Sequence, residues 1–167
     1  LAPSEQNYWL QYVALNLSDS SFQEAIKVAD RAIKYLPDAP MLYLYKSVAY
    51  SQLSQFDKAT ASIMTGIEKT DPEEVEMLSD LYGQLGDMYH QMGNNEKAYE
   101  AYETALKYFD ANVSVLNNYS YFLSLEKRDL DKAEEMILRA VKMEPKNSTY
   151  LDTYGWVLFQ KGEYVIA

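Results

Sequence analysis

His90 and Asp87 are a pair of residues whose types and spacing could support acid–base or metal chemistry. His90 is the only histidine in the chain, and Asp87 lies three residues before it. At this spacing the two side chains share one face of a helix. A zinc site needs three or four ligands, and no further carboxylate clearly accompanies them on that helix. We therefore interpret His90 as a solvated histidine rather than as a metal ligand or a general base.

An acidic cluster at residues 71–76, with the sequence DPEEVE, is the second place where potential metal ligands lie close together in the sequence. It lacks the alternating oxygen ligands and the central glycine of a calcium loop. Asp71 followed by Pro72 instead indicates a helix start, with a capping residue, a proline at the first helical position and an acidic first turn. No phosphate-binding glycine loop and no nucleophile-elbow motif occurs. We predict no cofactor, no metal ion and no enzymatic activity.

The net charge restricts the classes of partner that the chain is expected to bind. The chain has 167 residues, 15 basic and 25 acidic, with a net charge of −10. An acidic surface repels phosphate backbones and anionic lipid surfaces, so nucleic acid is not an expected partner. There is no cysteine, and no apolar run is long enough for membrane insertion of this segment. Since the chain begins at Leu1, we expect it to be a fragment of a longer protein.

The elements that position these residues repeat along the chain. Small residues recur at Ala25, Ala59, Ala98, Ala133 and Ala167, with spacings of 34, 39, 35 and 34. A second column, of bulky residues, runs Trp9, Tyr43, Tyr82, Leu116 and Leu151, with spacings of 34, 39, 34 and 35. A third column, again of small residues, runs Ala32, Gly66, Ala105 and Ala140, with spacings of 34, 39 and 35. A shared period with shared irregularities predicts structural repeats.

The columns divide the chain into four units and a half unit. The units are residues 6–39, 40–73, 79–112 and 113–147, and the half unit is 148–167. Apolar residues at helical spacing flank a turn signal such as Gly93-Asn94-Asn95, so each unit predicts two helices. Five extra residues before Ser79 are expected to lengthen one helix, and one extra residue falls between Leu123 and Ala133. Gly86 and Ala98 are expected to face each other across a helix hairpin.

These columns resemble the tetratricopeptide repeat, whose signature is W-x2-L-G-x2-Y, then A-x3-F, A and P. The third unit resembles it most, with Tyr82-x2-Leu85-Gly86-x2-Tyr89 followed by Ala98, Tyr102 and Ala105. The resemblance implies an all-α, right-handed α-solenoid of about 4.5 repeats and nine helices in a single domain, 1–167. The segments 116–119 and 150–158 are similar to those of bacterial repeat proteins, some of them envelope lipoproteins. The expected location is therefore the periplasmic side of a bacterial envelope or the cytoplasm.

The resemblance also implies a concave groove lined by the first helix of each unit. Family groove positions, carried onto this chain, give the following candidate partner-binding residues: Asn7, Leu10, Ala14, Met41, Leu44, Val48, Asp80, Asp87, His90, Asn117, Tyr121, Asp152, Trp156 and Phe159. The predicted groove is apolar at its N-terminal end, acidic in the middle and aromatic at its C-terminal end. The alternative is that individual positions merely pack against neighbouring helices.

The expected function is that of a scaffold which binds a peptide or protein segment in this groove. The candidate groove residues include aspartates but no lysine or arginine, so neutral or basic partners are favoured over acidic ones. A different class of function is a structural module that mediates self-association or positions a fused domain. The C-terminal end, with Trp156, Leu158 and Phe159 expected to be partly exposed, is predicted either to pack on a second copy or to be covered by further repeats of the parent protein. The alternative is that the neighbouring unit covers these side chains.

Overall fold

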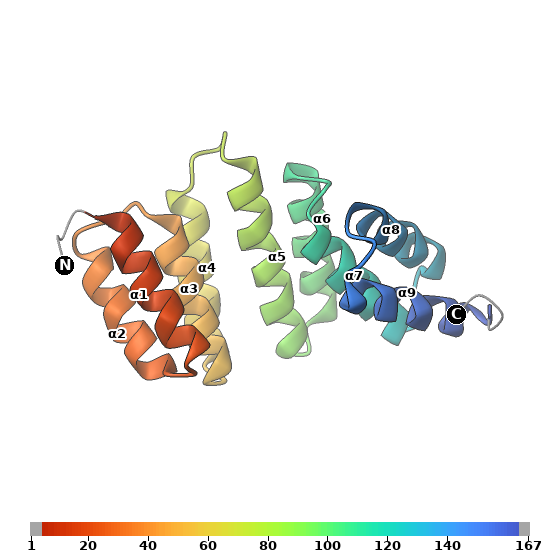
Figure 1. Cartoon of the computed structure of the whole chain (residues 1–167), viewed down its shortest axis with the longest axis horizontal. Coiled ribbons are helices and arrows are strands. Elements are labelled where there is room, and N and C mark those ends of the chain that lie inside the picture. The colour runs from red at the N-terminus through yellow and green to blue at the C-terminus, as the bar shows by residue number, and fades with distance from the viewer. Residues whose placement is uncertain (1–4, 164–167) are drawn as a thin grey trace.

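The computed structural model describes residues 5–163, which form nine α-helices and no strand (Figure 1). The helices are α1 (Gln6–Ser18), α2 (Phe22–Ile33), α3 (Pro40–Gln52), α4 (Phe56–Lys69), α5 (Val75–Gln91), α6 (Asn95–Tyr108), α7 (Val113–Leu125), α8 (Leu130–Met143) and α9 (Ser148–Lys161). The prediction of an all-α solenoid of helix–turn–helix repeats is confirmed. The C-terminal members of the repeat columns and of the half unit, residues 164–167, lie outside the described residues.

The end of every first helix has the same backbone conformation. Left-handed residues occur at Ser20, Ser54, Gly93, Lys127 and Gly162. In each case the amide of the next residue donates to the carbonyl five positions back, as from Ser21 to Asn16 at 2.8 Å and from Arg128 to Leu123 at 3.0 Å. This hydrogen bond is the one that ends a helix in a Schellman motif. The left-handed residues follow one another at 34, 39, 34 and 35 positions, the spacings of the bulky column.

The two irregular spacings have separate structural causes. Helix α5 has 17 residues, whereas α1, α3 and α7 have 13 each. The expectation that α5 begins at Pro72 is wrong, because it begins at Val75. Instead, the Glu73 amide donates to Asp71 Oδ1 at 2.9 Å and the Glu74 amide donates to the Asp71 carbonyl at 2.9 Å, which makes a separate turn. Four residues separate α7 from α8, whereas three separate the earlier pairs.

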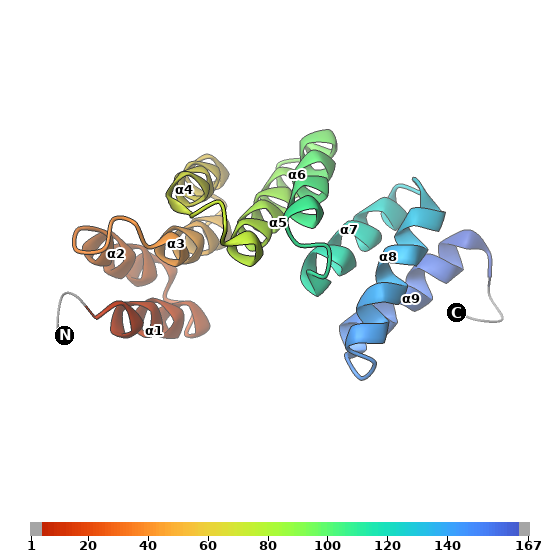
Figure 2. The same cartoon turned by 90° about the horizontal axis from the view of Figure 1, so that it is seen from above.

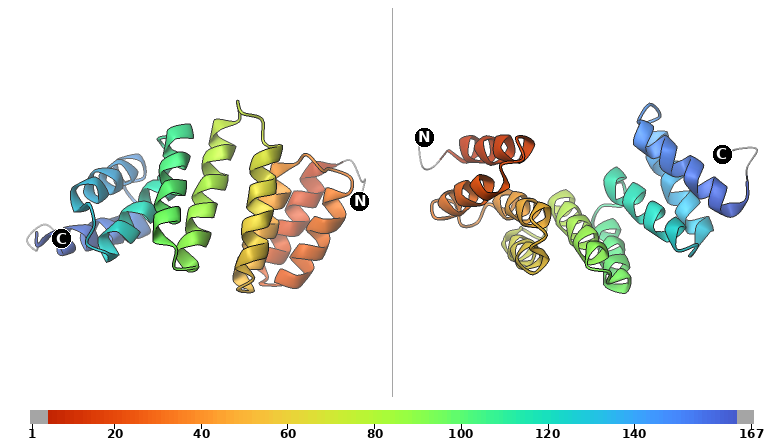
Figure 3. Two further views of the ribbon diagram at one scale, coloured as in Figure 1. Left: turned by 180° about the vertical axis from the view of Figure 1, so that it is seen from behind. Right: turned by 90° about the horizontal axis from the view of Figure 1, so that it is seen from below.

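The helix pairs stack along one axis from α1 to α9 (Figure 2). Each odd-numbered helix contacts the next odd-numbered helix, from α1 with α3 to α7 with α9. Among the described residues, the even-numbered helices contact only their own partner and the following odd-numbered helix. The odd-numbered helices therefore form one continuous layer. In Figure 1, α1 to α6 stand upright while α7 to α9 lie nearer the horizontal, which shows the twist of the array; Figure 3 shows it from behind and from below.

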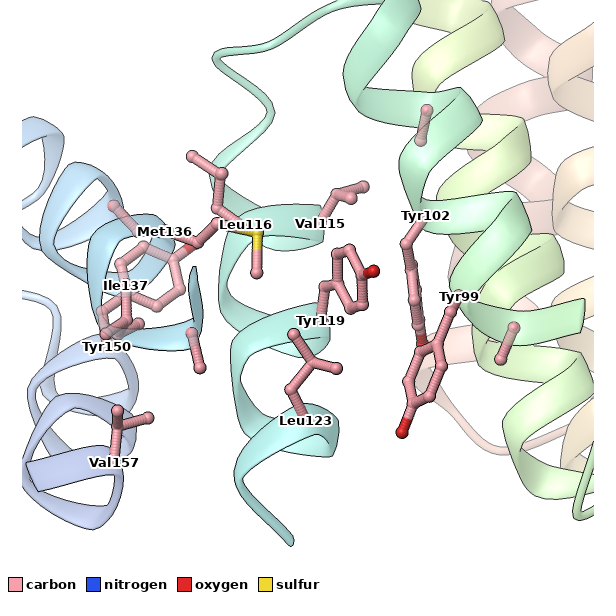
Figure 4. Close-up of a cluster of buried hydrophobic side chains, with 14 residues drawn as sticks. Tyr99, Tyr102, Val115, Leu116, Tyr119, Leu123, Met136, Ile137, Tyr150 and Val157 are labelled. Carbon is pink, nitrogen blue, oxygen red and sulfur yellow. The ribbon is translucent and has the colours of Figure 1, made fainter. Parts of the chain in front are cut away.

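The apolar core is divided into three clusters along the array. The N-terminal cluster, around Trp9 and Leu42, belongs to the first three helices, and a smaller cluster around Ile63 and Leu81 follows. The C-terminal cluster extends from α6 to α9 (Figure 4). In it, Tyr119 of α7 points toward Tyr102 and Tyr99 of α6, and its ring stacks on them at centroid distances of 5.4 and 5.5 Å. Aromatic stacking thus contributes to the contact between the third and fourth units.

The α5–α6 hairpin is close-packed at Gly86. A β-carbon at this position would lie 2.5–2.9 Å from three ring atoms of Tyr102. The expected neighbour of Gly86 was Ala98, which is fully buried, but the closest side chain is that of Tyr102. The small residue is therefore required by the tyrosine ring, which lies against the α5 backbone.

We predict that Gly86→Ala destabilises the protein by roughly 1–2 kcal/mol. The added methyl group overpacks a Tyr102 ring that is already held by Tyr119 and Phe122, and this effect exceeds the gain in helix propensity. Gly155→Ala in α9 is the matched control, because no atom lies within 4 Å of its β-carbon; it should stabilise the protein by up to about 1 kcal/mol. Urea unfolding measures both. Equal midpoints for the two variants would contradict the assigned contact.

Candidate partner-binding face

A cavity of about 540 Å³ lies between α7 and α9, two neighbouring helices of the continuous layer. Its lining residues recur at helical spacing, so each helix contributes one face. Helix α7 contributes Asn117, Tyr121 and Leu125, and α9 contributes Thr149, Asp152, Thr153 and Trp156. We call this cavity the α7/α9 pocket. Four of the candidate groove residues, Asn117, Tyr121, Asp152 and Trp156, come together in it.

The walls of the α7/α9 pocket are aromatic and partly exposed. Trp156 is 37% exposed, and its ring stacks on that of Phe159 at 5.6 Å between centroids. Tyr121 is 39% exposed, and its ring is tilted against that of Phe122 at 5.6 Å. Rings that are anchored on one side and open on the other lose little conformational entropy when a ligand packs on them. The expectation that Leu158 is exposed beside them is wrong, because this residue is 1% exposed.

A chain of hydrogen bonds leads from the interior of the protein to this pocket. The Tyr102 hydroxyl donates to Asp87 Oδ1 at 2.6 Å, and Asn118 Nδ2 donates to the same oxygen at 3.1 Å. Asn117 Nδ2 then donates to Asn118 Oδ1 at 3.1 Å. The chain ends at Asn117 Oδ1, a buried acceptor to which no described residue donates. We refer to these four residues as the Asp87–Asn117 chain.

The middle of the predicted groove is not an open acidic surface. Burial raises the pKa of the Asp87 carboxyl group, and the hydrogen bonds from Tyr102 and Asn118 oppose that shift. Asp80 is exposed but accepts a hydrogen bond from Asn112 Nδ2 at 2.8 Å. Gly83 leaves room for Val115, whose Cγ2 would be 2.5 Å from a β-carbon there. Asp80 and Asp87 thus help to join α5 to α7, with a cavity of about 200 Å³ beside them, while Asp80 also lines a cavity of about 440 Å³ with Glu73, Glu74 and Glu76.

Comparisons with known proteins support this architecture. Residues 79–112 and 113–147 match the tetratricopeptide repeat family, and these are the third and fourth units defined by the spacing. The chain is a tetratricopeptide repeat protein. It is 30% identical over 145 residues to a TPR repeat-containing protein of Pseudomonas aeruginosa, an alignment that covers 84% of this chain. The chain spans only 23% of the length of that relative.

Solved structures share the fold at low sequence identity. A thermophilic TPR protein of Thermus thermophilus superposes with a TM-score of 0.80 at 18% identity, over 95% of this chain and 84% of that one. YrrB, described as a TPR protein with an unusual peptide-binding site, superposes with a TM-score of 0.63 at 15% identity, over 93% and 77% of the two chains. At these identities the likeness concerns the fold alone.

His90 is not the solvated histidine that the sequence predicted for this tetratricopeptide repeat protein. Its imidazole stacks on the Phe122 ring at 3.5 Å between centroids and is partly buried. Desolvation lowers its pKa below the ordinary value of 6.5, although the negative charges of Glu126 and Asp87 act to raise the pKa. Within residues 5–163, no three potential ligands converge on a metal position, and no helix is long and apolar enough to cross a bilayer.

The remaining candidate residues lie outside the α7/α9 pocket. Asn7 is exposed on α1, whereas Leu10 packs against the N-terminal core cluster. Ala14, Met41 and Val48 are half-buried. Leu44 lines the small cavity beside α5, and Phe159 is 50% exposed next to Trp156. The N-terminal candidates are therefore distributed over α1 and α3, and none of them lines the α7/α9 pocket.

Apart from Thr149, which is a family groove position of the half unit, three residues of the site were missed by reasoning from the sequence. Leu125 and Thr153 line the α7/α9 pocket, and Asn118 connects Asn117 to Asp87. Leu125 lies eight residues after Asn117, and Thr153 lies four after Thr149, so helical spacing contained a signal for both. Asn118 was not recognisable in this way, because its role depends on Asp87 of another unit.

The imidazole of His90 should titrate below pH 6.5 in the folded protein. Because the folded state then binds fewer protons than the unfolded state, the free energy of unfolding should fall as the pH is lowered from 6.5 through the folded pKa. NMR titration is unambiguous, since the chain has one histidine. His90→Gln should lack this component of the pH dependence in urea unfolding. A measured pKa of 6.5 or higher would show that stacking on Phe122 does not desolvate the ring.

Proposed function

We propose that this chain is a scaffold that holds a peptide or protein segment on the layer formed by its odd-numbered helices. Tetratricopeptide repeats are protein-interaction modules, and their fold is typical of non-enzymatic scaffolds. The odd-numbered layer is the one to which the family resemblance assigns the groove. YrrB, a protein of similar fold, is itself described as having a peptide-binding site, which supports a peptide as the kind of partner.

The observation that carries the proposal is the α7/α9 pocket. Its volume of about 540 Å³ is within the range of small-molecule and side-chain sites. Partly exposed Tyr121 and Trp156 form its walls, and aromatic residues of this kind supply much of the binding energy in interfaces. Both helices that line the pocket belong to the odd-numbered layer. A segment anchored here could continue over the apolar N-terminal surface.

Selection from a phage-displayed library of random 16-residue peptides tests the proposal. We expect enriched peptides whose affinity falls at least tenfold, about 1.4 kcal/mol, with Trp156→Ala, since truncation removes a pocket wall. Met64→Ala is the matched control, because Met64 is 50% exposed on α4, in the other layer; it should leave the affinity unchanged. Titration calorimetry measures both. If the library yields no binder, or if Trp156→Ala leaves the affinity intact, the scaffold proposal fails.

A second candidate function, self-association through the ends of the array, is favoured by a different observation. Tyr8, Tyr12 and Leu15 on α1 are 52%, 38% and 57% exposed, and they lie at positions i, i+4 and i+7 of one helix face. At the other end, Leu151 and Phe159 of α9 are 44% and 50% exposed. Unlike surfaces at two ends join copies head to tail, and identical ones join them as a twofold dimer.

If the ends mediate self-association, the mass in sedimentation equilibrium should rise with protein concentration. Phe159→Glu or Leu15→Glu should then return the protein to a monomer, because a buried charge opposes the apolar contact. Met64→Glu, at an exposed apolar position within the array, is the control and should not change the mass. A monomer mass that is constant up to millimolar concentration would contradict this second function.

A further inference from the structure

We propose that the α7/α9 pocket receives a basic side chain of the partner segment, with Asn117 Oδ1 and the Asp152 carboxylate as its acceptors. The inference rests on the proposed function and states which chemistry the partner must present. Three independent features of the pocket support it: its charge, the direction of its hydrogen bonds and its aromatic walls.

The charge of the pocket is that of Asp152. This residue is the one charged side chain among the seven that line the pocket. Within residues 5–163, its carboxylate forms no ion pair and accepts no side-chain hydrogen bond, whereas Asp80 and Asp87 are bonded to neighbouring helices. The chain as a whole carries −10. A cationic group would therefore be attracted over distance and paired on arrival.

The Asp87–Asn117 chain fixes which polar atom of Asn117, a residue that lines the pocket, is left without a partner. An ionised carboxylate only accepts hydrogen bonds, so Asn118 must turn its amide nitrogen toward Asp87. Its oxygen then faces Asn117 and accepts from Nδ2, which leaves Asn117 Oδ1 at the end of the chain. Asn117 is 7% exposed and its Oδ1 is buried in the free protein, so the Asn117 side chain must turn toward the pocket when a ligand donates to it. The unmet atom is thus an acceptor, and a ligand that satisfies it must be a donor.

The aromatic walls favour a cationic donor over a neutral one. A guanidinium or ammonium group is attracted to the face of a tryptophan or tyrosine ring, and a guanidinium can stack on the ring while it donates from its edge. Trp156 and Tyr121 stand beside the two acceptors in the same pocket. One basic side chain can therefore pair with Asp152, donate to Asn117 and pack on an aromatic ring.

The test compares small probes that differ in charge, of which the arginine and citrulline probes have nearly the same shape. Nα-acetyl-arginine amide, Nα-acetyl-lysine amide and the uncharged Nα-acetyl-citrulline amide are titrated into the ¹⁵N-labelled chain. The indole signals report directly, because the chain has two tryptophans: Trp156 lines the pocket, and Trp9 is 3% exposed and serves as an internal reference. We expect arginine or lysine amide to shift the Trp156 signal with an affinity at least tenfold above that of citrulline amide.

Variants separate recognition from structural support. Asn117→Leu should weaken binding of the arginine probe at least tenfold with little change in the melting temperature, because the variant removes an unsatisfied acceptor and, at the same time, the donor to Asn118 Oδ1. Asp152→Asn should weaken it similarly without change in stability. Gln23→Leu is the control, an exposed amide side chain on α2 in the other layer, and should bind the probe as the unchanged chain does.

The outcomes distinguish this inference from the function on which it rests. Citrulline amide binding as well as arginine amide would overturn the basic-side-chain assignment. The same holds if Asn117→Leu leaves probe binding intact, because Oδ1 would then take no part in recognition. Library peptides that need Trp156 but contain no arginine or lysine would leave the scaffold function standing and refute this inference. A library without binders refutes the scaffold itself.

Discussion

The carboxylate of Asp87 joins three helices, and much of the C-terminal half of the protein depends on it. It lies on α5, accepts from Tyr102 on α6 and accepts from Asn118 on α7. Burial disfavours its charged form, and these two hydrogen bonds offset that penalty. The bond to Tyr102 holds the ring that covers Gly86 and stacks on Tyr119. The bond to Asn118 orients the amide that in turn orients Asn117. Packing of the hairpin and polarity of the pocket therefore have one origin.

Much of the fold could be predicted because the residue pattern that specifies it repeats along the chain. The left-handed position that closes each first helix is occupied by Ser20, Ser54, Gly93, Lys127 and Gly162, so no single residue type marks it. The column spacings locate it nevertheless. The start of α5 could not be predicted in the same way. Asp71 and Pro72 are typical of a helix start, but their hydrogen bonds close a separate turn in a segment that belongs to no column.

The candidate site was predictable only in part, because the repeat period places a residue on one face of a helix but does not determine which side chains it contacts. Asn117, Tyr121, Asp152 and Trp156 were assigned to the groove, and they do line one pocket. Asp80, Asp87 and His90 were assigned by the same rule, yet each is engaged by a side chain 31 or 32 positions away. Whether such a pair meets depends on the angle between successive repeats, and small differences in side-chain volume set that angle.

The division of the core into three clusters gives the array an uneven stiffness. The N-terminal cluster and the C-terminal cluster are each broad, whereas the one between them has four buried members among the described residues, Ile63, Leu81, Leu85 and Ala101. Segments with few buried apolar contacts open at lower free energy than the rest of a protein. We therefore expect local opening of the array to begin at this smaller core, whose members come from α4, α5 and α6. Opening there would change the curvature of the helical layer and with it the length of segment that the surface beside the pocket can hold.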